Sequence, residues 1–133
     1  MNAGAETTAY TSAVCMYYLV ENKRVLEKLR AEIEAVVPTT TTGWGLPSVA
    51  VLRKLQYLEA CFKEFQRLRS IINIPSERVV PKAGATIAGV DIFGGTIVSM
   101  DTGGLFANPA IYGPDVDGYR PERWIEASDE QRT

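Results

Sequence analysis

Glu64 and Arg67 are the first residues in this 133-residue sequence whose types and spacing could do chemistry. On a helix, side chains three residues apart lie on the same face, and Glu before Arg is the favourable order. The helical wheel places Glu64 between Tyr57 and Leu68 on the apolar face, so its carboxylate is expected to be desolvated and to need hydrogen-bonded cations. Arg67 is one such cation. The alternative is a solvated surface pair that contributes about 0–1 kcal/mol.

A second cation is expected from residues 120–124, which read RPERW. The proline stiffens this segment and the tryptophan can anchor it, so Arg123 is expected to be held in a fixed place. The tetrapeptide PERW alone is a weak signal. Together with the first pair, however, it predicts that Arg67 and Arg123 both contact Glu64.

Three helices are predicted to position these side chains. Residues 9–20 are apolar on nearly every side of a helical wheel, which is typical of a helix buried on all faces. The next helix is amphipathic, with Lys28 and Glu32 spaced to pair at i,i+4. By periodicity, the second and third helices cover residues 23–37 and 49–69; the first is expected over residues 3–22.

Beyond residue 75 the pattern changes to β-branched residues interrupted by glycines. Residues 78–100 are predicted to form short strands, with a hairpin around Gly94 and Gly95. Residues 101–126 are rich in Gly, Pro, Asp and Asn and are predicted to form a long ordered coil. The fold class is therefore mainly α with a small β-hairpin or sheet (α+β).

Composition and charge exclude several classes of function. The net charge is −2, from 14 basic and 16 acidic residues without a long run of either sign, so nucleic acid is not an expected partner. Histidine is absent, which argues against His-based triads and zinc sites. The longest apolar stretch, residues 9–20, is shorter than the ~20 residues that span a bilayer, so no membrane anchor is expected in this chain.

The order of these motifs resembles the cytochrome P450 family, and its fungal members in particular. In that family a Glu-x-x-Arg helix, short strands and a PERF or PERW segment follow one another, and their Glu-Arg-Arg network fixes the meander under the haem. The resemblance runs from Ala3 to about Glu126 and implies a partial P450 domain over residues 1–133. It assigns Glu64, Arg67 and Arg123 to the structural network.

The N-terminal residues AGAETT, 3–8, match the (A/G)Gx(D/E)TT signature of the distal helix in this family. The resemblance implies that Gly4 leaves room over the iron. It also implies that Glu6 is the acid and Thr7 the alcohol that handle protons delivered to bound oxygen. The alternative is simple helix N-capping, with the glutamate favoured by the helix dipole.

Arg78 begins a third match. Together with Pro81, Gly84 and Gly89 it resembles the strands in which the family's arginine pairs with a haem propionate. The resemblance therefore makes Arg78 the candidate for that contact. The alternative is a solvated arginine at the edge of a strand.

The proximal ligand of the family is a cysteine thiolate in a later F-x-x-G-x-x-x-C-x-G loop, and this chain does not contain that loop. Its two cysteines, Cys15 and Cys61, lie in apolar helical segments without the backbone donors that stabilise a thiolate. We therefore expect no metal ligand among these residues and weak or absent haem binding by this chain alone.

The resemblance implies a parent enzyme that binds haem b and hydroxylates a small apolar organic substrate with activated O2. Electrons would come from NADPH-cytochrome P450 reductase. The parent is expected at the endoplasmic reticulum membrane, facing the cytosol, and the likeness to fungal members suggests secondary metabolism. The alternative is a truncated, catalytically inactive product that does not bind haem.

Overall fold

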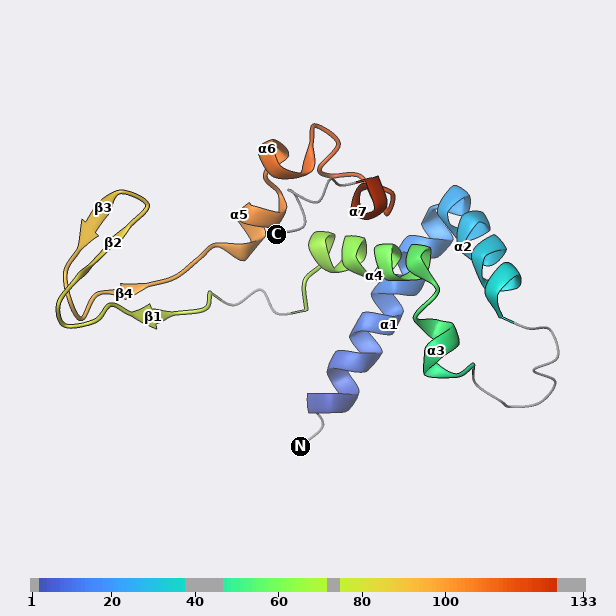
Figure 1. The fold of residues 1–133 in the computed structure, drawn as a ribbon, viewed down its shortest axis with the longest axis horizontal. Helices are drawn as coiled ribbons and strands as arrows, with labels where there is room; N and C mark the ends of the chain where they lie inside the picture. Colours follow the sequence, from blue (N-terminus) through green and yellow to red (C-terminus); the bar gives the residue numbers. More distant parts are fainter. Residues whose placement is uncertain (1–2, 38–46, 72–74, 127–133) are drawn as a thin grey trace.

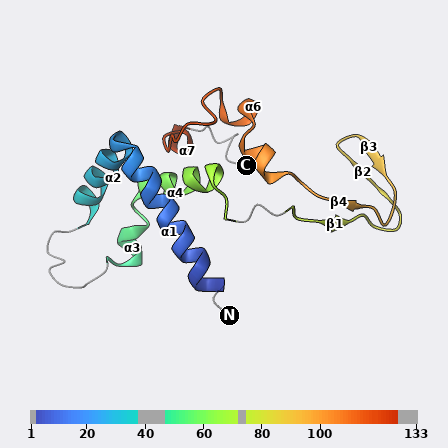
Figure 2. The same ribbon diagram turned by 180° about the vertical axis from the view of Figure 1, so that it is seen from behind.

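The computed structural model describes residues 3–37, 47–71 and 75–126. Helices α1, α2 and α4 cross one another in a single body, and the strands form an arm that extends to one side of it (Figure 1). Figure 2 shows the same arrangement from behind. The chain is mainly α with small antiparallel sheets. The first four helices are α1 (Ala3–Glu21), α2 (Lys23–Val36), α3 (Val49–Leu52) and α4 (Gln56–Leu68).

The apolar helix α1 is buried on one side and exposed on the other. Cys15 and Leu19 are buried where α1 meets α2 and α4. The prediction that residues 9–20 are buried on all faces is therefore wrong for this chain, because the described elements cover only part of the helix. The large side chains left exposed are Tyr10, Met16, Tyr17 and Val20, which are 45–61% accessible.

The helix predicted over residues 49–69 is interrupted, and α3 and α4 are separate helices. The chain turns after Leu52, and the side chain of Leu55, at the start of α4, is buried. The Glu32 carboxylate of α2 accepts hydrogen bonds from the backbone N–H groups of Tyr57 and Leu58 at 2.7 and 3.0 Å. This cap satisfies backbone donors that a new helix leaves unpaired, so a contact distant in sequence stabilises the break.

The strands are β1 (Arg78–Val79), β2 (Ala85–Ile87), β3 (Val90–Ile92) and β4 (Ile97–Val98). β2 pairs with β3 and β1 with β4, both antiparallel. The tight hairpin turn lies at Ala88-Gly89, both with positive φ, and not at the double glycine. A Cβ atom at Gly94 would lie 2.4 Å from the carbonyl oxygen of Lys82, so glycine there permits the close approach of two chain segments.

Residues 101–126 are not a simple coil, because three short helices interrupt them. These are α5 (Thr102–Phe106), α6 (Pro109–Tyr112) and α7 (Arg123–Glu126). Asp101 and Asn108 cap the first two through their side-chain oxygens, which accept from Gly104 N and Ala110 N. Local caps thus order a segment that has no helical periodicity.

The core lies where α1, α2 and α4 meet the segment before α7. Tyr119 of that segment stacks on Tyr18 of α1 with ring centroids 4.8 Å apart, and its hydroxyl donates to the Cys61 carbonyl of α4. Among the described residues no helix combines the length and apolar character needed to cross a bilayer. The buried members of the core are Cys15, Leu19, Val25, Leu29, Tyr57, Cys61, Phe65 and Tyr119.

Candidate functional site

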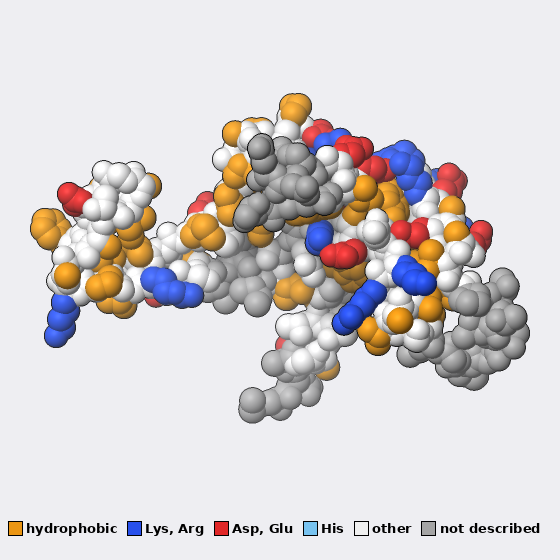
Figure 3. Space-filling view, in the orientation of Figure 1, with side chains coloured by type: hydrophobic (Ala, Val, Ile, Leu, Met, Phe, Trp, Pro, Cys, Tyr) orange, Lys and Arg blue, Asp and Glu red, His pale blue; other side chains and the backbone are white. Residues whose placement is uncertain are grey.

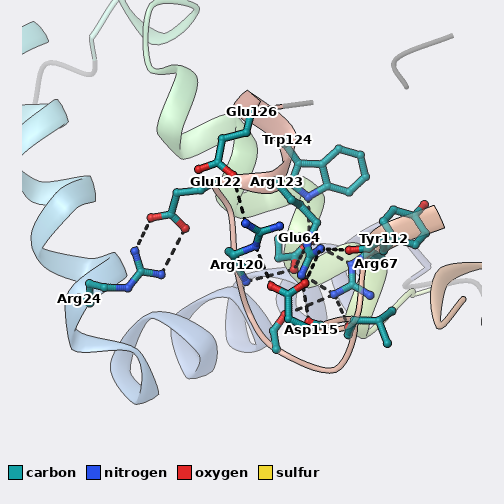
Figure 4. Close-up of polar contacts among 12 residues, drawn as sticks. Arg24, Glu64, Arg67, Tyr112, Asp115, Arg120, Glu122, Arg123, Trp124 and Glu126 are labelled. Carbon is teal, nitrogen blue, oxygen red and sulfur yellow. Dashed lines mark hydrogen bonds and ion pairs between the residues drawn. The ribbon is translucent and has the colours of Figure 1, made fainter. Parts of the chain in front are cut away.

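Glu64 is completely buried, and both of its carboxylate oxygens accept several hydrogen bonds (Figure 4). Arg67 binds it in a bidentate manner, with Nε 3.0 Å from Oε2 and Nη2 2.9 Å from Oε1. Arg123 Nε donates to Oε1 at 2.8 Å. The backbone N–H of Arg120 donates to Oε1 at 3.1 Å, and the indole N–H of Trp124 donates to Oε2 at 2.8 Å.

The two arginines also donate hydrogen bonds to backbone carbonyl oxygens between the end of α5 and the start of α7. Arg67 donates to the carbonyl oxygens of Phe106 at 2.8 Å and Val116 at 2.6 Å, and its guanidinium lies over the Tyr112 ring. Arg123 donates to the carbonyl oxygens of Tyr112 and Asp115. Because planar guanidinium groups fix several acceptors at once, Arg67 of α4 and Arg123 of α7 together hold the course of residues 106–118.

The electrostatics of the site keep Glu64 ionised. Burial by itself would raise the pKa of this carboxyl group, but hydrogen bonds from Arg67, the Arg120 backbone and Arg123 outweigh it and hold the pKa below its ordinary value. Asp115 also lies against Arg123, with Oδ1 3.4 Å from Nη1. The network is therefore a charged contact that connects α4 to residues 120–124.

The structure does not bring Gly4, Glu6 and Thr7 to this network. They lie in the first turns of α1, whose N-terminal end is apart from α7 in both views (Figures 1 and 2). All three are exposed in this chain, and no atom outside the neighbouring helix backbone comes within 4 Å of a Cβ built on Gly4. The neighbouring hydroxyl of Thr8 donates to the Gly4 carbonyl at 2.8 Å, so the small residue and the hydroxyls share one exposed helix end.

Arg78 is also separate from the network. It lies in β1, on the arm, and its side chain is exposed. Its Nη1 donates to the neighbouring Glu77 carbonyl at 2.8 Å. An exposed guanidinium on a paired strand fits the binding of an anion such as a carboxylate.

Cys15 and Cys61, the free cysteines among the described residues, are both buried. Burial raises the pKa of the Cys15 thiol, and it raises the pKa of the Cys61 thiol to about 12. Both thiols are therefore neutral near pH 7 in this chain, and either would have to lose its proton to bind a metal. Among these residues no group of three or more His, Cys, Asp or Glu side chains is arranged to hold a metal ion.

Comparison with known proteins gives the family. A sequence model described as Cytochrome P450 matches residues 1–133, the whole chain. The chain belongs to the cytochrome P450 family. Members of this family are haem proteins, and the order of the Glu64, Arg67 and Arg123 motifs is the one expected of it.

Its fungal relatives include monooxygenases. The cytochrome P450 monooxygenase cicH of Emericella nidulans is 36% identical over 133 residues, which are 100% of this chain and 27% of the relative. Pisatin demethylase of Fusarium vanettenii is 38% identical over 129 residues, 97% of this chain and 24% of the relative. This P450 chain therefore spans about a quarter of the length of these relatives.

The fold is the P450 fold as well. A solved structure of a zebra fish cytochrome P450 with progesterone superposes with a TM-score of 0.75 at 23% sequence identity. The match covers 95% of this chain and 28% of the other. At that identity the likeness describes the fold alone.

Sequence reasoning missed several participants in the site of this P450 chain. Trp124 was expected to anchor Arg123, whereas its indole N–H binds Glu64 directly. Glu122, inside the same PERW motif, received no role, although it contacts two helices. Two basic residues one helical turn apart on α2, Arg24 and Lys28, were a signal that this helix face binds a carboxylate.

Proposed function

We propose that this P450 chain is part of a haem-dependent monooxygenase that inserts one oxygen atom into a small apolar organic substrate. The observation that carries the proposal is the match to fungal P450 monooxygenases along the whole chain. Electrons are supplied by NADPH-cytochrome P450 reductase, and the enzyme lies at the endoplasmic reticulum membrane facing the cytosol. Its fungal relatives favour a role in secondary metabolism.

In this proposal Glu64, Arg67 and Arg123 are structural residues that do not touch the substrate. Their support is the burial of Glu64 and the two guanidinium groups that bind it at 2.8–3.0 Å. By holding the carbonyl groups of the segment after α5, they shape the surface on which the haem rests. Loss of Glu64 would leave the buried Arg67 guanidinium without its carboxylate partner and Arg123 with only its longer contact to Asp115.

Haem b, when bound, supplies the one-electron and oxygen chemistry of such an enzyme. Two features of this chain support its binding. The exposed guanidinium of Arg78 can bind a propionate, and the open space around Gly4 leaves room over the iron. The thiolate ligand would come from outside the described residues, because Cys15 and Cys61 are packed in the hydrophobic core between the helices.

Glu6 and Thr7 move protons in this proposal. They are consecutive residues near the start of α1, on a helix with no other acidic residue before Glu21. A carboxylate beside a hydroxyl can order a water molecule and pass its proton onward. Because both side chains are exposed in this chain, they can receive protons from solvent.

The test uses the longest natural form of the protein, produced with haem and reduced under carbon monoxide. We expect a thiolate-type Soret band, together with reductase- and NADPH-dependent incorporation of one 18O atom from O2 into an apolar test compound. Absence of haem from the purified protein would overturn the proposal. For residues 1–133 alone, added haem should give no thiolate-type Soret band. A strong band would contradict the statement that neither Cys15 nor Cys61 is the thiolate ligand.

A further inference from the structure

Glu122 joins three elements through its carboxylate. Lys28 Nζ of α2 lies 2.7 Å from Oε1, and the Tyr57 hydroxyl of α4 donates to Oε1 at 3.0 Å. Arg24 of α2 binds both oxygens, with Nη2 3.2 Å from Oε2. The Glu122 side chain is only 14% exposed, whereas those of Arg24 and Lys28 are 57% and 51% exposed, so the carboxylate of this cluster is shielded from solvent although its cations are not.

The surroundings of Glu122 favour its charged form. Burial by itself would raise the pKa of this carboxyl group, but hydrogen bonds from Arg24 and Lys28 dominate and hold the pKa well below its ordinary value. The pKa of Tyr57 is raised, first by burial and then by its bond to Glu122, so the phenol remains a donor. The cluster therefore persists as a charged contact at neutral pH.

Glu122 and Arg123 are neighbours in sequence but face opposite ways. In Figure 4 Glu122 points to Arg24, whereas Arg123 and Trp124 point toward Glu64. A single helical turn orders this segment, with Ile125 N and Glu126 N both donating to the Glu122 carbonyl. Since α7 begins at Arg123 and successive residues of a helical turn are rotated by about 100°, the side chains of this short segment leave the chain in different directions.

We propose that Glu122 is a positioning residue that sets the register of residues 120–124, so that Arg123 and Trp124 reach Glu64. A slip by one residue would bring the Glu122 carboxylate toward the Glu64 carboxylate, where like charges repel. It would also take Glu122 away from Arg24 and Lys28. The segment is thus held from two sides: α2 binds the Glu122 carboxylate through Arg24 and Lys28, and the Glu64 carboxylate of α4 binds Arg123 and Trp124.

The direct test is a double-mutant cycle of Glu122→Gln and Trp124→Phe in the longest natural form of the protein. Glu122→Gln should lower the thermal unfolding midpoint by at least about 3 °C. In the double variant the midpoint should fall by clearly less than the sum of the decreases in the two single variants. The reason is that Trp124 contributes less to stability once Glu122 no longer holds its segment in place. Additive falls, within about 1 °C, would overturn the proposal.

Glu59→Gln is the matched control, because Glu59 pairs with Lys63 at 2.8 Å but both side chains are about half exposed or more. It should leave the midpoint unchanged and be additive with Trp124→Phe. If Glu122→Gln gives no folded protein, the same cycle uses the joint change Arg24→Gln and Lys28→Gln, which removes both cations that hold Glu122; additivity there overturns the proposal equally.

Only a second readout, the rate of haem loss, rests on the proposed function. Glu122→Gln should lose haem at least about threefold faster than Glu59→Gln, a change that mere surface charge would not produce. A protein without haem would refute the proposed function and leave the unfolding cycle interpretable. Equal rates of haem loss in the two variants, in a haem-containing protein, would overturn the positioning role.

Discussion

At the scale of residues, Glu64 organises the site because its two oxygens accept bonds from three side chains and one backbone N–H. The sequence predicted a desolvated carboxylate at this position and the two arginines that bind it. It did not predict the backbone donor of Arg120 or the indole donor of Trp124. Those contacts depend on how the segment turns after Tyr119, which no local pattern encodes.

Trp124→Phe tests the indole contact alone. The substitution keeps an aromatic ring and removes the N–H that lies 2.8 Å from Glu64 Oε2. Because hydrogen bonds to charged groups contribute about 1.5–3 kcal/mol, we expect a loss of that order in the free energy of unfolding. Urea unfolding followed by circular dichroism measures it. An unchanged free energy of unfolding would mean that Trp124 stabilises the fold through its ring and not through its N–H group.

The depressed pKa values of Glu64 and Glu122 predict acid sensitivity. Both groups bind protons more weakly when folded, so their contribution is present above the ordinary glutamate pKa of about 4.3. It is lost as pH falls below that value, through the folded pKa values. Urea midpoints between pH 7 and pH 3 should therefore fall steeply, and less steeply in Glu122→Gln, where Arg24, Lys28 and Tyr57 no longer face a titrating group. Equal slopes would contradict this assignment.

At the scale of elements, contacts between helices decided what local periodicity could not. The sequence predicted the start of α1, the amphipathic α2 and the helix that carries Glu64. It predicted a pair between Lys28 and Glu32, whereas Lys28 binds Glu122 and Glu32 caps α4. Because the cap at the start of α4 comes from Glu32 of another helix, the sequence of residues 49–69 alone could not predict the break before α4.

Glu32→Gln tests this cap. The carboxylate accepts two backbone N–H groups at the start of α4, where negative charge is also favoured by the helix dipole. Its neutralisation should reduce the free energy of unfolding by about 0.5–2 kcal/mol. Glu34→Gln, an exposed change on the same helix, is the control and should have little effect. Equal effects of the two variants would refute the capping role.

At the scale of the whole molecule, this chain exposes apolar surface that a larger P450 would cover. Figure 3 shows hydrophobic side chains over the strand arm, and Phe93 of that arm is 88% exposed. Tyr17 and Met16 of α1 are 61% and 58% exposed. The pattern of residues 9–20 predicted burial on all faces, whereas α2 and α4 pack against one side of α1 and leave the other side exposed.

Residues 1–133 produced alone should therefore self-associate and bind an apolar dye. Tyr17→Lys should lower both, because it places a charge in the exposed face of α1. Gln66→Lys adds the same charge to an exposed position of α4 and should change neither. Light scattering and dye fluorescence measure the two effects, and equal behaviour of the variants would show that α1 is not the responsible surface.

The central claim is that the Glu64 network is the scaffold of a haem monooxygenase. The most direct measurement is the haem content per protein of Glu64→Ala, in the longest natural form, by the reduced carbon monoxide difference spectrum. Removing the carboxylate leaves the buried Arg67 without its anionic partner and Arg123 with Asp115 alone, at a cost of about 3–5 kcal/mol. We predict that Glu64→Ala abolishes haem incorporation while Glu59→Ala retains it. Normal haem incorporation in Glu64→Ala would contradict the account.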